Sequence, residues 1–403
     1  MLIREMIRNV YKECKGVPKG SCLTKEQRLS LQMDEFMNRR YEFRYNTQIG
    51  EVEYRERFSF QFYFHSIDKR AQNSIMLDAQ SEGIGVWDRD IDRYLHSNRV
   101  PIYNPLEEFL FHLPHWDGKD RIHALANRVP CKNPHWELLF HRWFLNMVSH
   151  WRGVDKMHAN NTSPILVGRQ GTHKSTFCRE MIPPALRAYY TDSIDFSHKR
   201  DAELYLNRFA LINIDEFDQI TLPQQGFLKH ILQKPVVNLR KPHGRSVLEL
   251  QRYASFIGTS NQKDLLTDPS GSRRFICIEV TGNIDTTQPI DYEQLYAQAM
   301  HEIYHGERYW FDSEDEQIMT ENNREFEQTP AMLQLFYQYF KAAQTKEEGE
   351  FLTPVEILNY LKKKSGMSLS DNKVYHFGRL LQKCGIPSKH TYKGTVYQVI
   401  KLS

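Results

Sequence analysis

The chain has 403 residues, 40% hydrophobic and 26% charged, which excludes collagen-like, low-complexity and wholly disordered classes and leaves room for two or three domains. Its longest apolar runs are strand-sized and the charged N-terminus lacks the apolar stretch of a signal peptide, so we expect a cytoplasmic protein with no membrane partner. The net charge of +3, from 53 basic and 50 acidic residues, does not by itself indicate a nucleic-acid partner.

Residues 1–102 are predicted to form an N-terminal accessory region of helices with one β-hairpin. Thr24 and Gln27 have the spacing of a helix capping box. Farther along, apolar and polar residues alternate over 41–55 on both sides of Gly50, a pattern typical of two strands joined by a tight turn. No residue pattern in this region predicts a chemical function.

Residues 103–311 are predicted to form a helical lead-in and an ATPase core. The β-rich run 164–167 is followed by a glycine-bearing loop and a helical pattern, which resembles a P-loop. Such a loop surrounds phosphates with backbone N–H groups, while a lysine lies beside them and a hydroxyl holds Mg²⁺. Lys174 and Ser175 fit the last two roles. The residues expected to bind ATP are Gly168, Gln170, Gly171, Thr172, His173, Lys174, Ser175 and Thr176.

His173 departs from the usual P-loop pattern, in which a glycine precedes the lysine. If the backbone there requires a positive φ, a histidine costs about 1 kcal/mol or more. If the position is helical, a histidine is tolerated. The sequence leaves both conformations open.

Two further apolar runs end in polar residues suited to catalysis. One ends at Asp215 and Glu216, as a Walker B strand does; if it lies beside the P-loop strand, Asp215 joins Ser175 in holding Mg²⁺ and Glu216 polarises the attacking water. The other run, 253–260, is followed by Asn261, which is placed to orient the same water from a neighbouring strand. We therefore expect these side chains to converge.

Arg273 and Arg274 precede another predicted strand, 275–280. We expect one of them to act as an arginine finger on the nucleotide of a neighbouring subunit, which requires several copies assembled as a ring. The predicted catalytic set is Lys174, Asp215, Glu216, Asn261, Arg273 and Arg274.

The order of these features, together with the segments 103–121 and 271–275, resembles the virulence-associated protein E family, primase-associated P-loop ATPases related to superfamily 3 helicases and AAA+ proteins. The resemblance covers about residues 103–280. It implies an α/β core of the P-loop AAA+ or superfamily 3 type, assembled as a hexamer. The implied function is an ATP-dependent DNA helicase or translocase that replicates a phage or mobile element. A primase signature is absent from the sequence, so we expect any partner primase to be a separate chain.

The same resemblance implies a hairpin that follows DNA. Within 237–250, two alternating runs surround a basic, glycine-containing turn. A basic hairpin at this place in superfamily 3 helicases lines the central channel and follows single-stranded DNA, which points to Lys241 and His243, with Arg240 and Arg245 as further phosphate contacts. The alternative is an exposed hairpin whose charged tip serves only solubility.

Charge changes sign late in the chain. Residues 312–350 carry ten acidic and three basic side chains and are predicted to form an acidic helical linker, whereas residues 351–403 carry nine basic and two acidic ones. In the basic part, Thr353 precedes a helical pattern, a second helix is predicted over 372–384, and alternating runs on both sides of Gly394 predict a hairpin. This order is typical of a winged-helix domain, which binds duplex or forked DNA or serves as a protein interaction module.

Two other functions share parts of this pattern. Residues 261–264 approximate the guanine-reading motif of GTPases, although glutamine replaces the usual lysine, and residues 215–218 lack the glycine that senses the γ-phosphate in those proteins. A P-loop ATPase that responds to nucleic acid or to a phage protein, and signals in a defence system, would keep the catalytic residues and would not unwind DNA.

Overall fold

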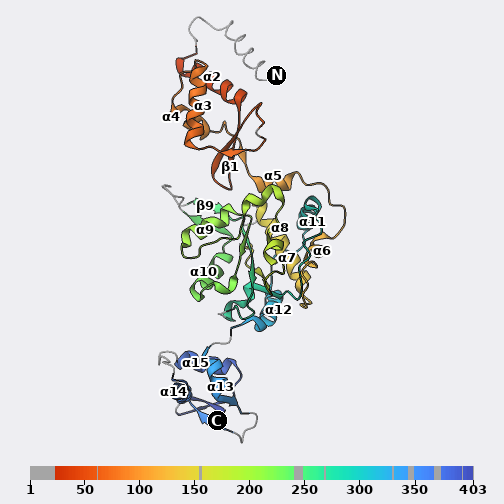
Figure 1. Cartoon of the computed structure of the whole chain (residues 1–403), viewed down its shortest axis with the longest axis vertical. Coiled ribbons are helices and arrows are strands. Elements are labelled where there is room, and N and C mark those ends of the chain that lie inside the picture. The colour runs from red at the N-terminus through yellow and green to blue at the C-terminus, as the bar shows by residue number, and fades with distance from the viewer. Residues whose placement is uncertain are drawn as a thin grey trace.

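The computed structural model describes residues 23–60, 62–153, 157–239, 248–266, 269–328, 331–343, 349–366, 374–392 and 394–402. Three bodies follow one another in chain order along its longest axis: an N-terminal body, a central α/β body and a C-terminal body (Figure 1). Each has its own hydrophobic side-chain cluster, and the central body has two. In the part of the chain that is described, no helix is both long and apolar enough to cross a membrane.

The N-terminal body packs helices on a small sheet. Strands β1 (Tyr41–Asn46) and β2 (Glu51–Glu56) pair antiparallel and form the predicted hairpin, with Gly50 at a φ of 71° in the turn. Thr24 and Gln27 form the predicted capping box. The other elements are α2 (Lys25–Arg40), β3 (His65–Ser66), α3 (Lys69–Ser81), α4 (Asp88–Leu95) and β4 (Ile102–Tyr103), and the sheet order is β3-β2-β1-β4.

A helical segment precedes the central sheet. It consists of α5 (Pro105–Phe111), α6 (Arg121–Ala126) and α7 (Trp136–Trp151). Trp143 and Trp151 of α7 are completely buried, and Trp136 nearly so. Because α7 is apolar around most of its circumference, it lies inside the protein, against the sheet, rather than on the surface.

The central body is built on a five-stranded parallel sheet. The strands are β5 (Ser163–Val167), β6 (Tyr190–Thr191), β7 (Leu211–Ile214), β10 (Ser255–Ser260) and β11 (Phe275–Glu279), in the order β11-β5-β10-β7-β6. Strand β10 therefore lies between β5 and β7, and the expectation that the Asp215 strand lies directly beside the P-loop strand is wrong. Crossover connections let a later strand pair between two earlier ones, so chain order does not fix sheet order.

Helices cover both faces of this sheet. Along β5, Leu166 belongs to the cluster on the side of α7 and α11 (Tyr292–Tyr304), whereas Ile165 and Val167 belong to the cluster on the side of α9 (Lys199–Arg208) and α10 (Leu222–Leu232). The remaining helical elements are α8 (Lys174–Glu180), α12 (Ser313–Asn323), η1 (Pro184–Tyr189), η2 (Phe217–Gln219), η3 (Pro269–Arg274) and η4 (Arg324–Phe326).

Strands β8 (Val236–Leu239) and β9 (Leu248–Gln251) pair antiparallel between α10 and β10 and form the stem of the hairpin predicted over 237–250. Arg252, directly after the stem, is completely buried. Its guanidinium donates hydrogen bonds to five backbone carbonyls, those of Ile231, Leu232, Lys234, Ala254 and Asn160.

The C-terminal body has the predicted order of helix, helix and hairpin. Its elements are α13 (Ala331–Tyr339), β12 (Phe340–Ala342), β13 (Glu350–Leu352), α14 (Pro354–Ser365), α15 (Val374–Lys383), β14 (Ser388–Thr391) and β15 (Gly394–Lys401). Strand β15 pairs antiparallel with β12, β13 and β14.

The segment 312–350, expected to be a linker, packs on both neighbouring bodies. Helix α12 lies against η3 and β11 of the central body, and its Met319 is buried there. Helix α13 contributes Leu333 and Phe336 to the hydrophobic cluster of the C-terminal body. The apolar residues of this segment therefore decide where it packs, and one of its acidic residues, Asp315, is itself buried in an ion pair with Arg142.

Candidate nucleotide-binding site

The loop after β5 lies very close to two other strand ends. The Gly168 N–H donates a hydrogen bond of 3.0 Å to the Ser260 carbonyl, and a Cβ atom at Gly168 would lie only 3.0 Å from the Val280 carbonyl oxygen. This close approach favours a glycine, because a side chain here would push the Val280 carbonyl away. Gly171, in the same loop, has a φ of 84°, which is again a glycine conformation.

His173 has a left-handed backbone conformation, which glycine adopts without steric cost. Its φ of 65° and ψ of 22° lie in the left-handed region, where a residue with a Cβ atom costs about 1–2 kcal/mol. The open question about this position is thereby settled in favour of positive φ. The histidine at this position therefore carries local backbone strain.

The Lys174 ammonium lies inside the loop. Its Nζ donates to the carbonyls of Gly168 at 2.7 Å and Arg169 at 2.8 Å, and to Asn261 Oδ1 at 3.2 Å. Burial lowers the pKa of the ammonium, and the neighbouring Asp215 charge opposes this shift. Because this ammonium is largely shielded from water, it strongly attracts any anion that enters the loop.

Two carboxylates follow β7. Asp215 accepts hydrogen bonds from Ser175 Oγ, at 3.0 Å, and from Thr259 Oγ1. A hydroxyl and a carboxylate are oxygen ligands of the kind that Mg²⁺ prefers, so Ser175 and Asp215 fit the predicted metal site. Glu216 has a left-handed φ of 53° and faces the same cavity.

The end of β10 links the lysine to the carboxylates. Thr259 Oγ1 donates to the Asp215 carboxylate, and Ser260 Oγ donates to Asp218 Oδ1 at 2.8 Å. The Asn261 side-chain oxygen accepts a hydrogen bond from Lys174. The sequence predicts Asn261 as a site residue but not Thr259, Ser260 or Asp218. The signal that could have found Thr259 and Ser260 is their position as consecutive hydroxyl residues at the end of a buried strand.

The lysine, the two carboxylates after β7, Thr259 and Asn261 line one cavity of about 300 Å³ at the carboxyl edge of the sheet. Of the predicted nucleotide-binding residues, all but Gly168 line it, and so do the predicted catalytic residues Asp215, Glu216 and Asn261. The full lining is Gln170, Gly171, Thr172, His173, Lys174, Ser175, Thr176, Asp215, Glu216, Thr259 and Asn261. Hydroxyls, carboxylates and one ammonium suit a phosphate chain with its cation better than an apolar ligand.

Arg273 and Arg274 lie at the other edge of the sheet. They end η3, and β11, which follows, runs parallel to β5 with Phe275 paired to Ser163. The arginines are therefore level with the start of β5, whereas the P-loop follows its end. Arg273 Nη1 donates to Glu316 Oε2 at 3.0 Å. Neither arginine lines the nucleotide cavity of its own chain.

The residues predicted to bind DNA, Arg240, Lys241, His243 and Arg245, lie outside the described residues. The strands β8 and β9 that flank them are paired as expected for a hairpin.

A parallel sheet with a glycine loop, a Lys-Ser pair and an aspartate converging at its carboxyl edge defines a P-loop protein, and this fold implies nucleotide binding. The virulence-associated protein E-like domain matches residues 110–328, more than half of the chain, and the chain belongs to this family. Residues 329–399 match a second family, described as a domain of unknown function from B. Theta (DUF3874). The two matches meet just before α13.

Among solved structures, the chain is similar to an apo structure of the NrS-1 C-terminal region, with 11% identity over 92% of this chain and 98% of that one and a TM-score of 0.47. An A-form apo structure of the same region has 10% identity over the same shares of the two chains and a TM-score of 0.45. No curated protein matches the chain.

Proposed function

We propose that this chain is an ATP-dependent DNA helicase or translocase of the superfamily 3 and AAA+ type that acts in the replication of a phage or mobile element. The observation that carries the proposal is the convergence of Lys174, Asp215, Glu216 and Asn261, from separate strand ends, on one polar cavity. Membership of the virulence-associated protein E-like family supports it.

In this proposal the side chains divide the work of ATP hydrolysis. Lys174 and the loop N–H groups bind the β- and γ-phosphates, and Asn261 orients the attacking water. Glu216 takes a proton from that water. Mg²⁺ held by Ser175 and Asp215 would neutralise phosphate charge when bound.

The position of Arg273 and Arg274 supports a ring. A head-to-tail contact between copies brings the η3 edge of one sheet toward the P-loop edge of the next, and such a contact closes into a ring when the rotation allows it. One arginine would then stabilise the charge of the neighbour's reacting phosphate. A hexamer is the size that the family resemblance implies.

Single-stranded or forked DNA is the proposed substrate, with any primase on a separate chain. Lys241 and His243, with Arg240 and Arg245, would follow the strand from the tip of the β8–β9 hairpin. The order of α14, α15 and the β14–β15 hairpin supports a winged-helix domain, and the basic charge of this part suits contact with phosphates.

ATP turnover with and without single-stranded DNA, measured beside fork unwinding, tests the proposal. We expect DNA-stimulated hydrolysis and unwinding in the wild type, and loss of both in Lys174→Ala and Glu216→Gln. Hydrolysis without unwinding would favour a signalling or defence ATPase instead. Faster turnover of GTP than of ATP would favour a GTPase, and the absence of turnover with either nucleotide would contradict the enzyme assignment.

Lys241→Ala tests the hairpin separately. Because the proposed role of Lys241 is to hold the strand rather than the nucleotide, we expect unwinding to be abolished while basal ATP hydrolysis stays largely intact. Loss of both activities together would contradict this division of roles.

A further inference from the structure

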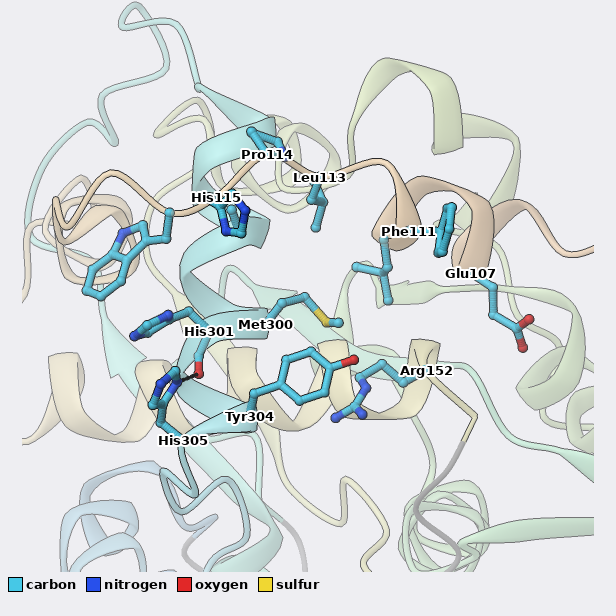
Figure 2. Close-up of a pocket in the computed structure, with 13 residues that line it drawn as sticks. Glu107, Phe111, Leu113, Pro114, His115, Arg152, Met300, His301, Tyr304 and His305 are labelled. Atoms are coloured by element: carbon cyan, nitrogen blue, oxygen red, sulfur yellow. Dashed lines mark hydrogen bonds between the residues drawn. The ribbon is translucent and has the colours of Figure 1, made fainter.

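A second cavity lies between α5, the loop after it, α11 and the end of α7 (Figure 2). Its volume is about 550 Å³, within the size range of sites that hold small organic groups. Among the described residues, this cavity and the nucleotide cavity share no lining side chain. The proposed ATPase chemistry therefore leaves it unexplained.

Flat aromatic rings form one wall of this cavity. The ring centres of Trp116 and His301 are 4.9 Å apart, and those of His301 and His305 are 3.9 Å apart in a stacked arrangement. His305 Nδ1 lies 2.7 Å from the His301 carbonyl oxygen, which fixes the orientation of its ring. Figure 2 shows Tyr304 between these histidines and Arg152. Such surfaces stack well against other planar rings.

Arg152 supplies a permanent positive charge at the other end of the cavity. Its guanidinium carbon is 4.4 Å from the centre of the Tyr304 ring, a cation–π contact. A guanidinium has five N–H donors, in a fork whose geometry matches phosphate oxygens. The Glu107 carboxylate, also in the lining, suits the amino group of a base.

Gly153, the residue after Arg152, lies close to the stem of the β8–β9 hairpin. A Cβ atom at Gly153, next to Arg152, would lie 3.7 Å from the side chain of Gln251, the last residue of β9, and 3.8 Å from Glu107 Oε1. The cavity, which combines stacking surfaces with a guanidinium, is therefore near the base of the hairpin, where Gln251 pairs with Val236.

We propose that this cavity binds a nucleotide unit of single-stranded DNA, with the base against the rings of Trp116 and Tyr304 and the phosphate on Arg152. The inference rests on the proposed function, because it assigns a second contact to the same strand. A free mononucleotide has the same chemistry, and the test separates the two sources.

The test uses the full chain and oligothymidylate. We expect Tyr304→Ala to weaken binding about fivefold to a hundredfold and Tyr304→Phe, which keeps the ring, to restore it. Arg152→Gln should weaken binding and lower its salt dependence by about one phosphate contact. Trp87→Ala is the matched control, because Trp87 is 63% exposed and Tyr304 67%, and Trp87 lies in the N-terminal body. Basal ATP hydrolysis should be unchanged in all four variants.

Photocrosslinking places the contact directly. With 4-thiothymidine in the oligonucleotide, crosslinked peptides should contain Trp116 or Tyr304. If Tyr304→Ala binds DNA like the wild type while Lys241→Ala does not, this site is refuted and the proposed function stands. If the wild type binds no DNA, the proposed function itself fails. A final test is competition for the site between thymidine monophosphate and the oligonucleotide. If the monophosphate competes as strongly per nucleotide, the site binds a free nucleotide and the proposal of a DNA strand is overturned.

Discussion

His173 holds a conformation that glycine adopts freely, with a φ of 65°. We expect His173→Gly to raise the free energy of unfolding by about 0.5–1 kcal/mol, because relief of the left-handed strain exceeds the entropy that glycine adds to the unfolded chain. Urea unfolding measures this change. Thr172→Gly is the control and should destabilise, because it removes the hydrogen bond from Thr172 Oγ1 to the Arg169 carbonyl. Destabilisation by His173→Gly would mean that the imidazole makes stabilising contacts larger than the strain.

Lys174 predicts a pH dependence of nucleotide binding. Burial lowers the pKa of its ammonium in the free protein, whereas a bound triphosphate favours the charged form and raises that pKa. Between the two pKa values binding takes up a proton, so affinity falls as pH rises. For a non-hydrolysable ATP analogue we expect log Kd to increase, by up to about one per pH unit, above about pH 8, where the phosphates are already ionised. A flat profile up to about pH 10 would show that the ammonium does not titrate in this range.

The motif residues could be predicted from the sequence because each belongs to a local pattern. Lys174 and Ser175 follow a glycine loop, and Asp215 follows an apolar run. Thr259 and Ser260 are marked in the sequence only as consecutive hydroxyl residues at the end of an apolar run, and their contacts with carboxylates depend on which strand lies beside β7. Spacing along the chain carries no information about that neighbour.

At the scale of elements, Arg252 joins the end of α10, the hairpin stem and the start of β10. We expect Arg252→Met to lower the free energy of unfolding by about 3 kcal/mol or more, because it leaves several buried carbonyls without a donor. The free energy of unfolding of Arg252→Lys should fall between those of the wild type and Arg252→Met, since an ammonium has three N–H donors and a guanidinium five. Urea unfolding would measure both.

The control is Lys234→Met, which breaks a partly exposed ion pair with Glu203. We expect it to cost about 1 kcal/mol or less. If Arg252→Met is as mild as this control, water or a shifted backbone satisfies the carbonyls in place of the guanidinium.

Helices and strands with clear end signals were predictable. Thr353 caps α14 as expected, and α15 occupies Val374–Lys383 within the predicted 372–384. The order of strands in the central sheet was not predictable, because parallel strands are joined by crossovers and buried runs such as β7 and β10 are interchangeable in apolar character.

At the scale of the whole molecule, the separation of the arginines from the P-loop predicts complementation between copies. The Lys174→Ala variant should be inactive because its own P-loop does not bind nucleotide. The double Arg273→Ala, Arg274→Ala variant should also be inactive, because it supplies no arginine finger to its neighbour. When the two variants are mixed, some interfaces between copies combine an intact P-loop with intact arginines. We therefore expect ATP turnover to reappear in the mixture.

The matched control for this experiment is a variant that carries all three substitutions. Mixed with the Lys174→Ala chain, it forms no interface with an intact P-loop, so turnover should stay absent. Failure of the first mixture to regain activity, although the two variants co-assemble, would contradict an arginine that acts in trans.

The division between the central and C-terminal bodies shows why charge is a poor guide to domain limits. The change of sign falls near residue 350, yet Phe336 and Phe340 already pack in the C-terminal cluster. Surface charge reports on solvated faces, whereas a body is defined by the apolar residues that it buries.

Glu216 has a consequence for anyone who engineers this chain for heat resistance. Its left-handed backbone, with a φ of 53°, makes glycine the more stable choice at this position, by about 1 kcal/mol. A screen that rewards survival at high temperature would therefore enrich Glu216→Gly, which lacks the carboxylate that the proposed hydrolysis needs. At this residue, selection for durability and selection for turnover favour different amino acids.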